Sequence, residues 1–233
     1  MTSAPPAPSG RAEDAGAHAR RRVGKAIRDL GHAVVGHQAP ADVLHGVADT
    51  LAAVTSTVGD GAPRQRELEI GGDVLGVELP EGEPIRAYDD RPFSGLASPW
   101  GVDLEVHRRG DEIEGLLMLG AAHEGAPARA HGGIVAGLFD DVFGFVLGIL
   151  QQAAFTGELT VRYEAATPLH RRLACRGRLR ERRGRKIWID GELVDLETPG
   201  QPVVARAHGL FIAVDREQLR TPTAALPAPP DEA

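Results

Sequence analysis

The strongest constraint on the fold is one long apolar segment, residues 131–150, which has a helical pattern and begins on two glycines. His131-Gly132-Gly133 predicts a tight turn that exposes backbone amide donors at the start of a helix. Two adjacent acids, Asp140 and Asp141, follow about two turns further on. The pattern is typical of a ligand-binding helix and equally of a buried core helix whose acids lie at a solvated edge.

Strand patterns flank this helix on both sides. Before it, residues 102–107 alternate apolar and polar side chains, and a second run, 112–119, follows a Gly110-Asp111 turn, which predicts a hairpin. Four more strand-like runs come after the helix, at 155–163, 173–181, 186–195 and 203–214. Because a single helix accompanies so many strands, the order excludes alternating β-α units. It predicts an α+β fold in which an antiparallel sheet wraps around a long central helix.

The N-terminal part has a different pattern, that of a helical hairpin over residues 19–59. Apolar residues recur every three or four positions in two stretches, separated by a break at 36–40: Val23, Ile27, Leu30 and Val34, then Leu44, Val47, Leu51, Val54 and Val58. Such a hairpin is typical of an accessory packing element, and also of a lid or an oligomer contact.

The remaining boundaries follow from composition. The expected divisions are a disordered tail at 1–18, an irregular Gly- and Pro-rich linker at 60–95, the main domain at 96–216 and a second disordered tail at 217–233.

Charge and aromatic content argue against nucleic acid as a partner of the whole chain. The formal net charge of −7 argues against nucleic acid, whose binding depends on neutralised phosphates. An aromatic content of 4% also disfavours the stacking platforms that bind single strands.

The single cysteine and the acids of the apolar segment predict a cytoplasmic protein without a membrane span. Cys175 is the single cysteine, which fits a reducing compartment and a packed thiol. A span over the apolar segment is disfavoured because Asp140 and Asp141 would each cost about 2.5–3.5 kcal/mol at the bilayer centre.

Residues 124–133, Glu-Gly-Ala-Pro-Ala-Arg-Ala-His-Gly-Gly, with an acid nine positions after the histidine, add a family signal to this order of elements. Residues 156–163, Thr-Gly-Glu-Leu-Thr-Val-Arg-Tyr, a following Thr167-Pro168, and the turn Gly184-Arg185-Lys186 extend it. Together they resemble the hotdog-fold acyl-CoA thioesterases of the PaaI type over about residues 96–214.

The resemblance implies a metal-free and cofactor-free enzyme that hydrolyses thioesters of coenzyme A or of a carrier protein, as a homodimer or a dimer of dimers. Asp140 would be the catalytic carboxylate, acting as nucleophile or general base, and the Gly132 N–H the oxyanion donor. His131 would shape that end of the site and Thr156 would position the water or the carboxylate. Some relatives carry an asparagine before His-Gly-Gly, whereas the loop here has no amide side chain.

Helix spacing predicts how such a site is assembled. Gly132 and Asp140 are eight residues apart, which is roughly 12 Å along a helix axis at about 1.5 Å per residue. One small thioester cannot contact both ends. If two copies of the helix lie antiparallel across a two-fold axis, the glycine turn of one meets the aspartate of the other.

A basic segment, residues 170–186, stands out in this acidic chain. Alternation places Arg176, Arg178, Arg180 and Arg182 on one face of the predicted strand. Arginine binds phosphate well, so Arg183, Arg185 and Lys186, together with Gly133 at the helix start, are the candidate coenzyme A contacts. A solvated outer sheet face balanced by acids explains the same charges.

No serine nucleophile elbow, phosphate-binding loop or paired Cys and His motif is present in the sequence. The alternative function is a non-catalytic acyl-CoA or acyl-carrier binder on the same fold, and a weaker rival is nucleic-acid binding through the arginine-rich segment. The sequence leaves the acyl group open.

Overall fold

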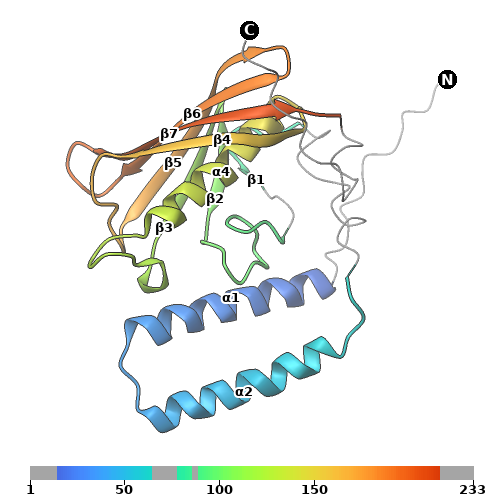
Figure 1. The fold of residues 1–233 in the computed structure, drawn as a ribbon, viewed down its shortest axis with the longest axis vertical. Coiled ribbons are helices and arrows are strands. Elements are labelled where there is room, and N and C mark those ends of the chain that lie inside the picture. The colour runs from blue at the N-terminus through green and yellow to red at the C-terminus, as the bar shows by residue number, and fades with distance from the viewer. Residues whose placement is uncertain (1–14, 65–77, 86–88, 216–233) are drawn as a thin grey trace, which may run out of the picture.

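The structure is a computed structural model that describes residues 15–64, 78–85 and 89–215 (Figure 1). Its helices are α1 (Ala15–Gly36), α2 (Ala41–Gly59) and α4 (Gly132–Ile149), with a short 3-10 turn η2 (Ala121–His123). Its strands are β1 (Pro84–Ile85), β2 (Glu105–Arg109), β3 (Glu112–Met118), β4 (Ala154–Tyr163), β5 (Arg172–Arg183), β6 (Lys186–Asp195) and β7 (Val203–Ala213).

The strands form one antiparallel sheet in the order β1-β2-β3-β5-β6-β7-β4, and α4 lies across its inner face (Figure 1). The predicted order of two strands, one long helix and four strands is confirmed, as is the N-terminal helical pair. Of the irregular linker expected at 60–95, residues 65–77 and 86–88 lie outside the described residues. Helix α1 begins at Ala15, inside the stretch expected to be a tail.

Helix α4 is the core helix of the sheet. Ten of its eighteen residues are buried, and its phenylalanines Phe139, Phe143 and Phe145 are fully enclosed. By length and composition alone it passes as a membrane span, but 56% of it is buried inside the protein. Its apolar surface is therefore used for packing on the strands.

Three glycines on neighbouring strands admit the Phe143 ring. Gly177 on β5, Gly191 on β6 and Gly209 on β7 face it, and an added Cβ at Gly191 would lie 2.6 Å from the ring. Without side chains at these positions, α4 approaches the middle of the sheet closely.

The outer face of the sheet carries a ladder of ion pairs. The Arg176 guanidinium lies 3.1 Å from Glu114 and 3.7 Å from Glu192, and Arg206 pairs with Glu192 at 2.9 Å. A bulge between Leu179 and Glu181 breaks the alternation, so Arg182 pairs across the sheet with the buried Ile187. The expectation that Arg182 shares a face with Arg176 is therefore wrong.

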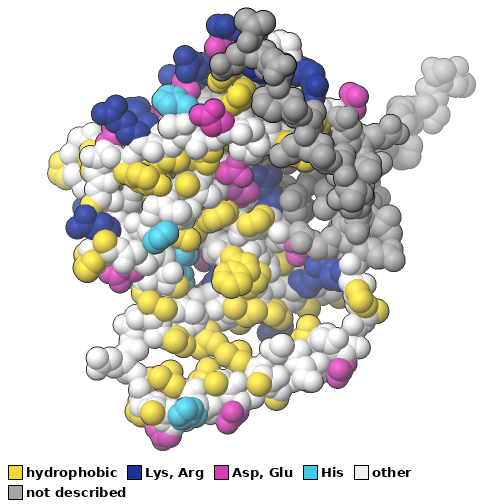
Figure 2. All heavy atoms as spheres, in the orientation of Figure 1, with side chains coloured by type: hydrophobic (Ala, Val, Ile, Leu, Met, Phe, Trp, Pro, Cys, Tyr) yellow, Lys and Arg dark blue, Asp and Glu magenta, His cyan; other side chains and the backbone are white. Residues whose placement is uncertain are grey.

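The N-terminal helices expose their apolar residues, and hydrophobic side chains gather along them (Figure 2). In α2 no residue is buried, and in α1 only Gly24 and Arg28 are. Pro40 stands at the start of α2, where its missing N–H is not needed. The periodicity predicted the hairpin, but most residues of its apolar stripes are exposed.

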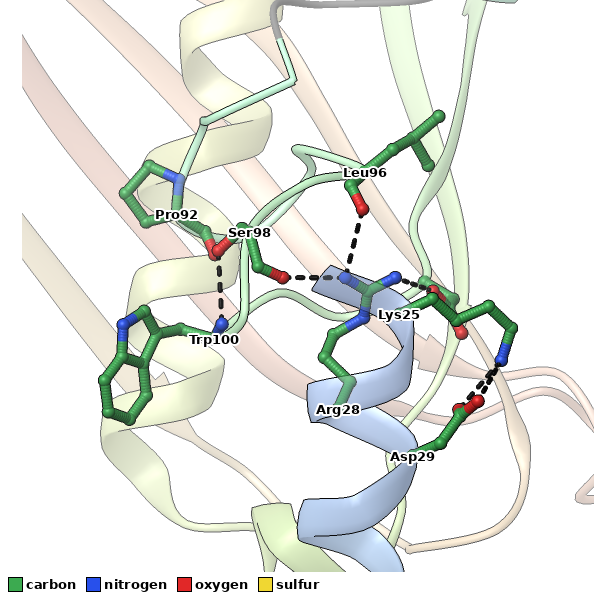
Figure 3. A network of polar contacts seen from close by, with 8 residues as sticks. Lys25, Arg28, Asp29, Pro92, Leu96, Ser98 and Trp100 are labelled. Carbon is green, nitrogen blue, oxygen red and sulfur yellow. Dashed lines mark hydrogen bonds and ion pairs between the residues drawn. The ribbon is translucent and has the colours of Figure 1, made fainter. Parts of the chain in front are cut away.

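One face of α1 is attached to the segment 89–103 (Figure 3). The buried Arg28 donates to the carbonyls of Leu96 and Ser98, at 3.2 and 2.7 Å, and to the Asp103 carboxylate at 2.8 Å. Gly24 lies against the Ala97 backbone, where a Cβ would come within 2.5 Å of the carbonyl oxygen. A glycine and a buried arginine thus dock the helix.

Candidate active site

Asp140 and Thr156 meet on the open side of α4. Both residues are exposed, and the Thr156 hydroxyl donates to Asp140 Oδ1 at 2.8 Å. Thr156 belongs to β4, the edge strand of the sheet. The carboxylate is therefore oriented by a neighbouring element and stays open to a ligand or to a second copy of the chain.

The neighbouring Asp141 has the opposite environment. It is 8% exposed, its Oδ1 accepts from Arg91 Nε at 2.8 Å, and its Oδ2 accepts from the Ser94 N–H at 2.7 Å. Arg91 also donates to the Asp141 carbonyl and stacks on Phe145, with the guanidinium carbon 4.4 Å from the ring centre. Asp141 therefore fastens the segment 89–95 to α4.

The glycine turn at the start of α4 is capped by its own histidine. His131 Nδ1 accepts the Gly133 N–H at 3.0 Å, so this amide is already used. The Gly132 N–H belongs to the first turn, where helix amides lack intrahelical acceptors. Its orientation at a helix N-terminus suits a developing negative charge.

Tyr163, which the sequence reasoning missed, holds this turn from the far end of β4. Its hydroxyl donates to the Gly132 carbonyl at 2.8 Å. A Cβ on Gly132 would lie 3.0 Å from the tyrosine hydroxyl oxygen. The glycine at this position therefore leaves room for the tyrosine. Tyr163 and Gly132 are thirty-one residues apart, so no local sequence pattern indicates their hydrogen bond.

Two further histidines, His123 and His32, support the turn before α4. The His123 carbonyl accepts the His131 N–H at 2.8 Å, and the His123 ring meets His32 of α1 edge to face at 4.8 Å. Burial and the neighbouring His32 lower the pKa of His123 to about 4. Helix α1 is thus linked through two rings to the turn that precedes α4.

The candidate phosphate-binding residues lie elsewhere, at the β5–β6 hairpin. Arg183 pairs with Glu181 at 2.8 Å, with its guanidinium 5.8 Å from the Trp188 ring centre, while Arg185 Nε donates to the Ala213 carbonyl at 3.0 Å. Lys186 is half-buried beside them at the start of β6. Within the described chain, no hydrogen bond joins these residues to Asp140 or Gly132.

A cavity of about 300 Å³ lies at the β1–β2 edge, opposite β4. Its lining includes Ile85, Leu96, Leu104 and Phe145 and none of the predicted site residues. Cys175 is fully buried, and burial raises the pKa of its thiol. It is therefore a packed residue and unsuited to attack a substrate.

The architecture, an antiparallel sheet curled around one long helix with an open carboxylate on that helix, is the hotdog fold. One solved structure, of a thioesterase superfamily protein, aligns over 88% of this chain and 97% of its own, with a TM-score of 0.66 and 25% identity. The resemblance seen in the sequence is therefore confirmed at the level of the fold.

Smaller thioesterases align over about half of the chain. They include a hypothetical thioesterase protein from Streptococcus pneumoniae TIGR4, solved with coenzyme A, at 19% identity over 47% of this chain and 87% of its own, with a TM-score of 0.44. The PaaI protein of E. coli aligns at 17% identity over 47% of this chain and 82% of its own, also with a TM-score of 0.44. No family model and no curated protein matches the sequence.

Proposed function

We propose that the chain hydrolyses acyl thioesters of coenzyme A or of an acyl-carrier protein, with Asp140 as the catalytic carboxylate. The observation that carries the proposal is the contrast between two adjacent acids. Both carboxylate oxygens of Asp141 accept hydrogen bonds, from Arg91 and from the Ser94 N–H. Asp140 is exposed, and its Oδ1 accepts a hydrogen bond from the Thr156 hydroxyl at 2.8 Å. A binder has no need of an oriented, open carboxylate at this place.

In the proposed reaction, water supplies the oxygen that ends on the acyl carbon and the C–S bond breaks. Asp140 removes a proton from that water, or attacks the carbonyl first and forms an anhydride that water then opens. The thiol leaves with a proton. The Gly132 N–H stabilises the negative charge that develops on the carbonyl oxygen.

We further propose that the two halves of each site come from different chains. Gly132 and Asp140 lie at different positions along one straight helix, α4, roughly 12 Å apart by helical rise. Asp140 and Thr156 are exposed beside the edge strand β4, where a second copy can approach. A two-fold contact there would bring the Gly132 turn of one protomer to Asp140 of its partner.

The direct test is a panel of acyl-CoAs of graded length and aromaticity, with release of free thiol as the measurement. Asp140→Asn is expected to lower kcat by about 10²–10⁴-fold with little change in KM, because it removes proton transfer and keeps the shape. Equal thiol release by both proteins across the panel would exclude this mechanism. Tight acyl-CoA binding without turnover in the wild type would favour the alternative, an acyl-CoA or acyl-carrier binder.

The shared site has its own test in mixed dimers. A heterodimer of Asp140→Asn and Gly132→Ala chains has both lesions in one site and an intact second site. About half of the wild-type activity per dimer is therefore expected. If each site were built from one chain, verified heterodimers would show no recovery.

A further inference from the structure

The exposed apolar residues of the N-terminal hairpin form a surface that the proposed reaction does not use. We define the hairpin face as the residues of the two apolar stripes of α1 and α2 that are at least 40% exposed: Val23, Ile27, Val34, Leu44, Leu51, Val54 and Val58. Figure 2 shows hydrophobic side chains gathered along both helices. A monomer rarely leaves so many large apolar side chains together in water.

Helix α2 needs an external partner to be stable. It has nineteen residues, none of them buried, and α1 packs against η2 but not closely against α2. An unsupported helix of this length is marginal in water, because most helical stability in proteins comes from packing an apolar face. A partner that covers this face would therefore stabilise the helix.

The α2 part of the hairpin face is free of charge. The apolar stripe of α2 repeats at spacings of three and four, while Asp42 and Asp49 fall on the opposite side of the helix. The hydroxyls of Thr50 and Thr57 donate to the carbonyls of Gly46 and Ala53 within the helix, so they need no acceptor from a partner. An uncharged face can meet an identical face without repulsion.

The side of α1 that contacts the body of the protein determines which way the hairpin face points. Gly24, Arg28 and His32 attach α1 to the body of the protein through Ala97, Asp103 and η2. Val23, Ile27 and Val34 lie on another side of the helix and point away from that attachment. The hairpin is therefore held by one side with its apolar side presented outward.

From these observations we infer that the hairpin face binds the same face of a second copy of the chain, as an intermolecular four-helix bundle. The face presents seven large apolar residues, each at least 40% exposed, which can supply much of the roughly 800 Å² that each partner contributes to a stable interface. On α2, which carries neither Lys nor Arg, a membrane is disfavoured as the occupant, because interfacial helices carry these residues. This contact is separate from the β4 edge of the proposed active site.

Disulfide trapping between differently tagged chains tests the contact. One chain carries Ile27→Cys and the other Leu51→Cys, both near the middle of their helices and so close to the two-fold axis. The control pair replaces Leu51→Cys by Ser56→Cys, on the opposite side of α2. Cys175 is fully buried and does not interfere.

The first pair is expected to form the covalent heterodimer at least about tenfold faster than the control pair. Equal rates, or no covalent species, would overturn the inference. Binding to lipid vesicles without trapping would also overturn it and would identify a membrane as the occupant.

A second measurement covers the possibility that the new cysteines disturb the helices. Leu51→Asp with Val54→Asp is expected to raise the dissociation constant of the complex at least about 100-fold over Ser56→Asp, in sedimentation equilibrium at micromolar concentrations. Retained circular dichroism of the sheet shows that the body still folds. An unchanged dissociation constant would contradict the inference, and neither readout depends on thioester hydrolysis.

Discussion

At the scale of single residues, the adjacent acids Asp140 and Asp141 of α4 have different hydrogen-bond partners and different exposure. Helix spacing does not distinguish Asp140 from Asp141, and only the family resemblance favours Asp140. In the structure, a guanidinium and a backbone amide from residues 91–94 hold Asp141, while a hydroxyl orients Asp140. Contacts made across about fifty residues therefore separate the roles.

Replacing Asp141 is expected to destabilise the fold. Asp141→Asn leaves Arg91 without its charge partner in a nearly buried position, with side chains 8% and 11% exposed, and should lower the free energy of unfolding by about 3 kcal/mol. Chemical denaturation measures the change. The control is Asp29→Asn, which breaks the solvent-exposed pair with Lys25 and should change the free energy of unfolding far less. Equal losses would show that the Arg91 pair is not structural.

The His123 ring gives a pH dependence to stability. Its folded pKa of about 4 lies below the ordinary value of 6.5, so the unfolded chain binds this proton more readily between these values. The free energy of unfolding should fall as pH is lowered from about 6.5 to about 4, by on the order of 2 kcal/mol from this group.

His123→Asn is expected to remove that part of the pH dependence while keeping an acceptor for the Gly120 N–H. The measurement is the difference between the unfolding free energies of the two proteins across the same pH range. A constant difference from pH 7 to pH 4 would mean that His123 does not supply the effect.

At the scale of elements, glycines decide how closely helices approach the rest of the molecule. Phe143 of α4 packs on the sheet at three positions that lack side chains, Gly177, Gly191 and Gly209. The Ala97 backbone packs against α1 at Gly24. The strand and helix spans follow from alternation and periodicity. The glycine contacts could not be predicted, because each joins residues distant in sequence.

A matched pair of substitutions in α1 separates docking from helix propensity. Gly24→Ala should destabilise the attachment of α1, because its Cβ would lie 2.5 Å from the Ala97 carbonyl oxygen. Gly31→Ala has nothing within 4 Å of its Cβ and should stabilise the helix by up to about 1 kcal/mol. Hydrogen exchange of α1 amides measures both. The same sign of change for the two variants would contradict the docking contact.

At the scale of the whole molecule, an acidic chain with a net charge of −7 is proposed to bind a polyanionic thioester. Long-range attraction is therefore unfavourable, and binding would rely on a local basic surface. The outer-face arginines Arg176 and Arg206 are paired with acids on neighbouring strands, as the solvated-face interpretation predicts. Arg183 and Arg185 at the β5–β6 hairpin remain the predicted phosphate contacts.

Charge reversal tests that prediction. Arg183→Glu with Arg185→Glu should raise KM for acyl-CoA about tenfold or more and weaken the salt dependence of KM, with kcat little changed. The control is Arg172→Glu with Arg178→Glu, which changes the charge equally at exposed positions along β5. An unaltered KM, or equal effects of both pairs, would show that the hairpin does not bind the nucleotide.

The sequence by itself determined the order of elements, the central helix and the helical hairpin, because periodicity of two or of about 3.6 residues is a local property that the sheet and the helices preserve. The tertiary structure decided which acid is open, which amide of the glycine turn is already used, and on which side of the sheet Arg182 lies. It also decided that most residues of the apolar stripes of α1 and α2 are exposed. These outcomes depend on contacts between distant residues and on one bulge, which local patterns do not encode.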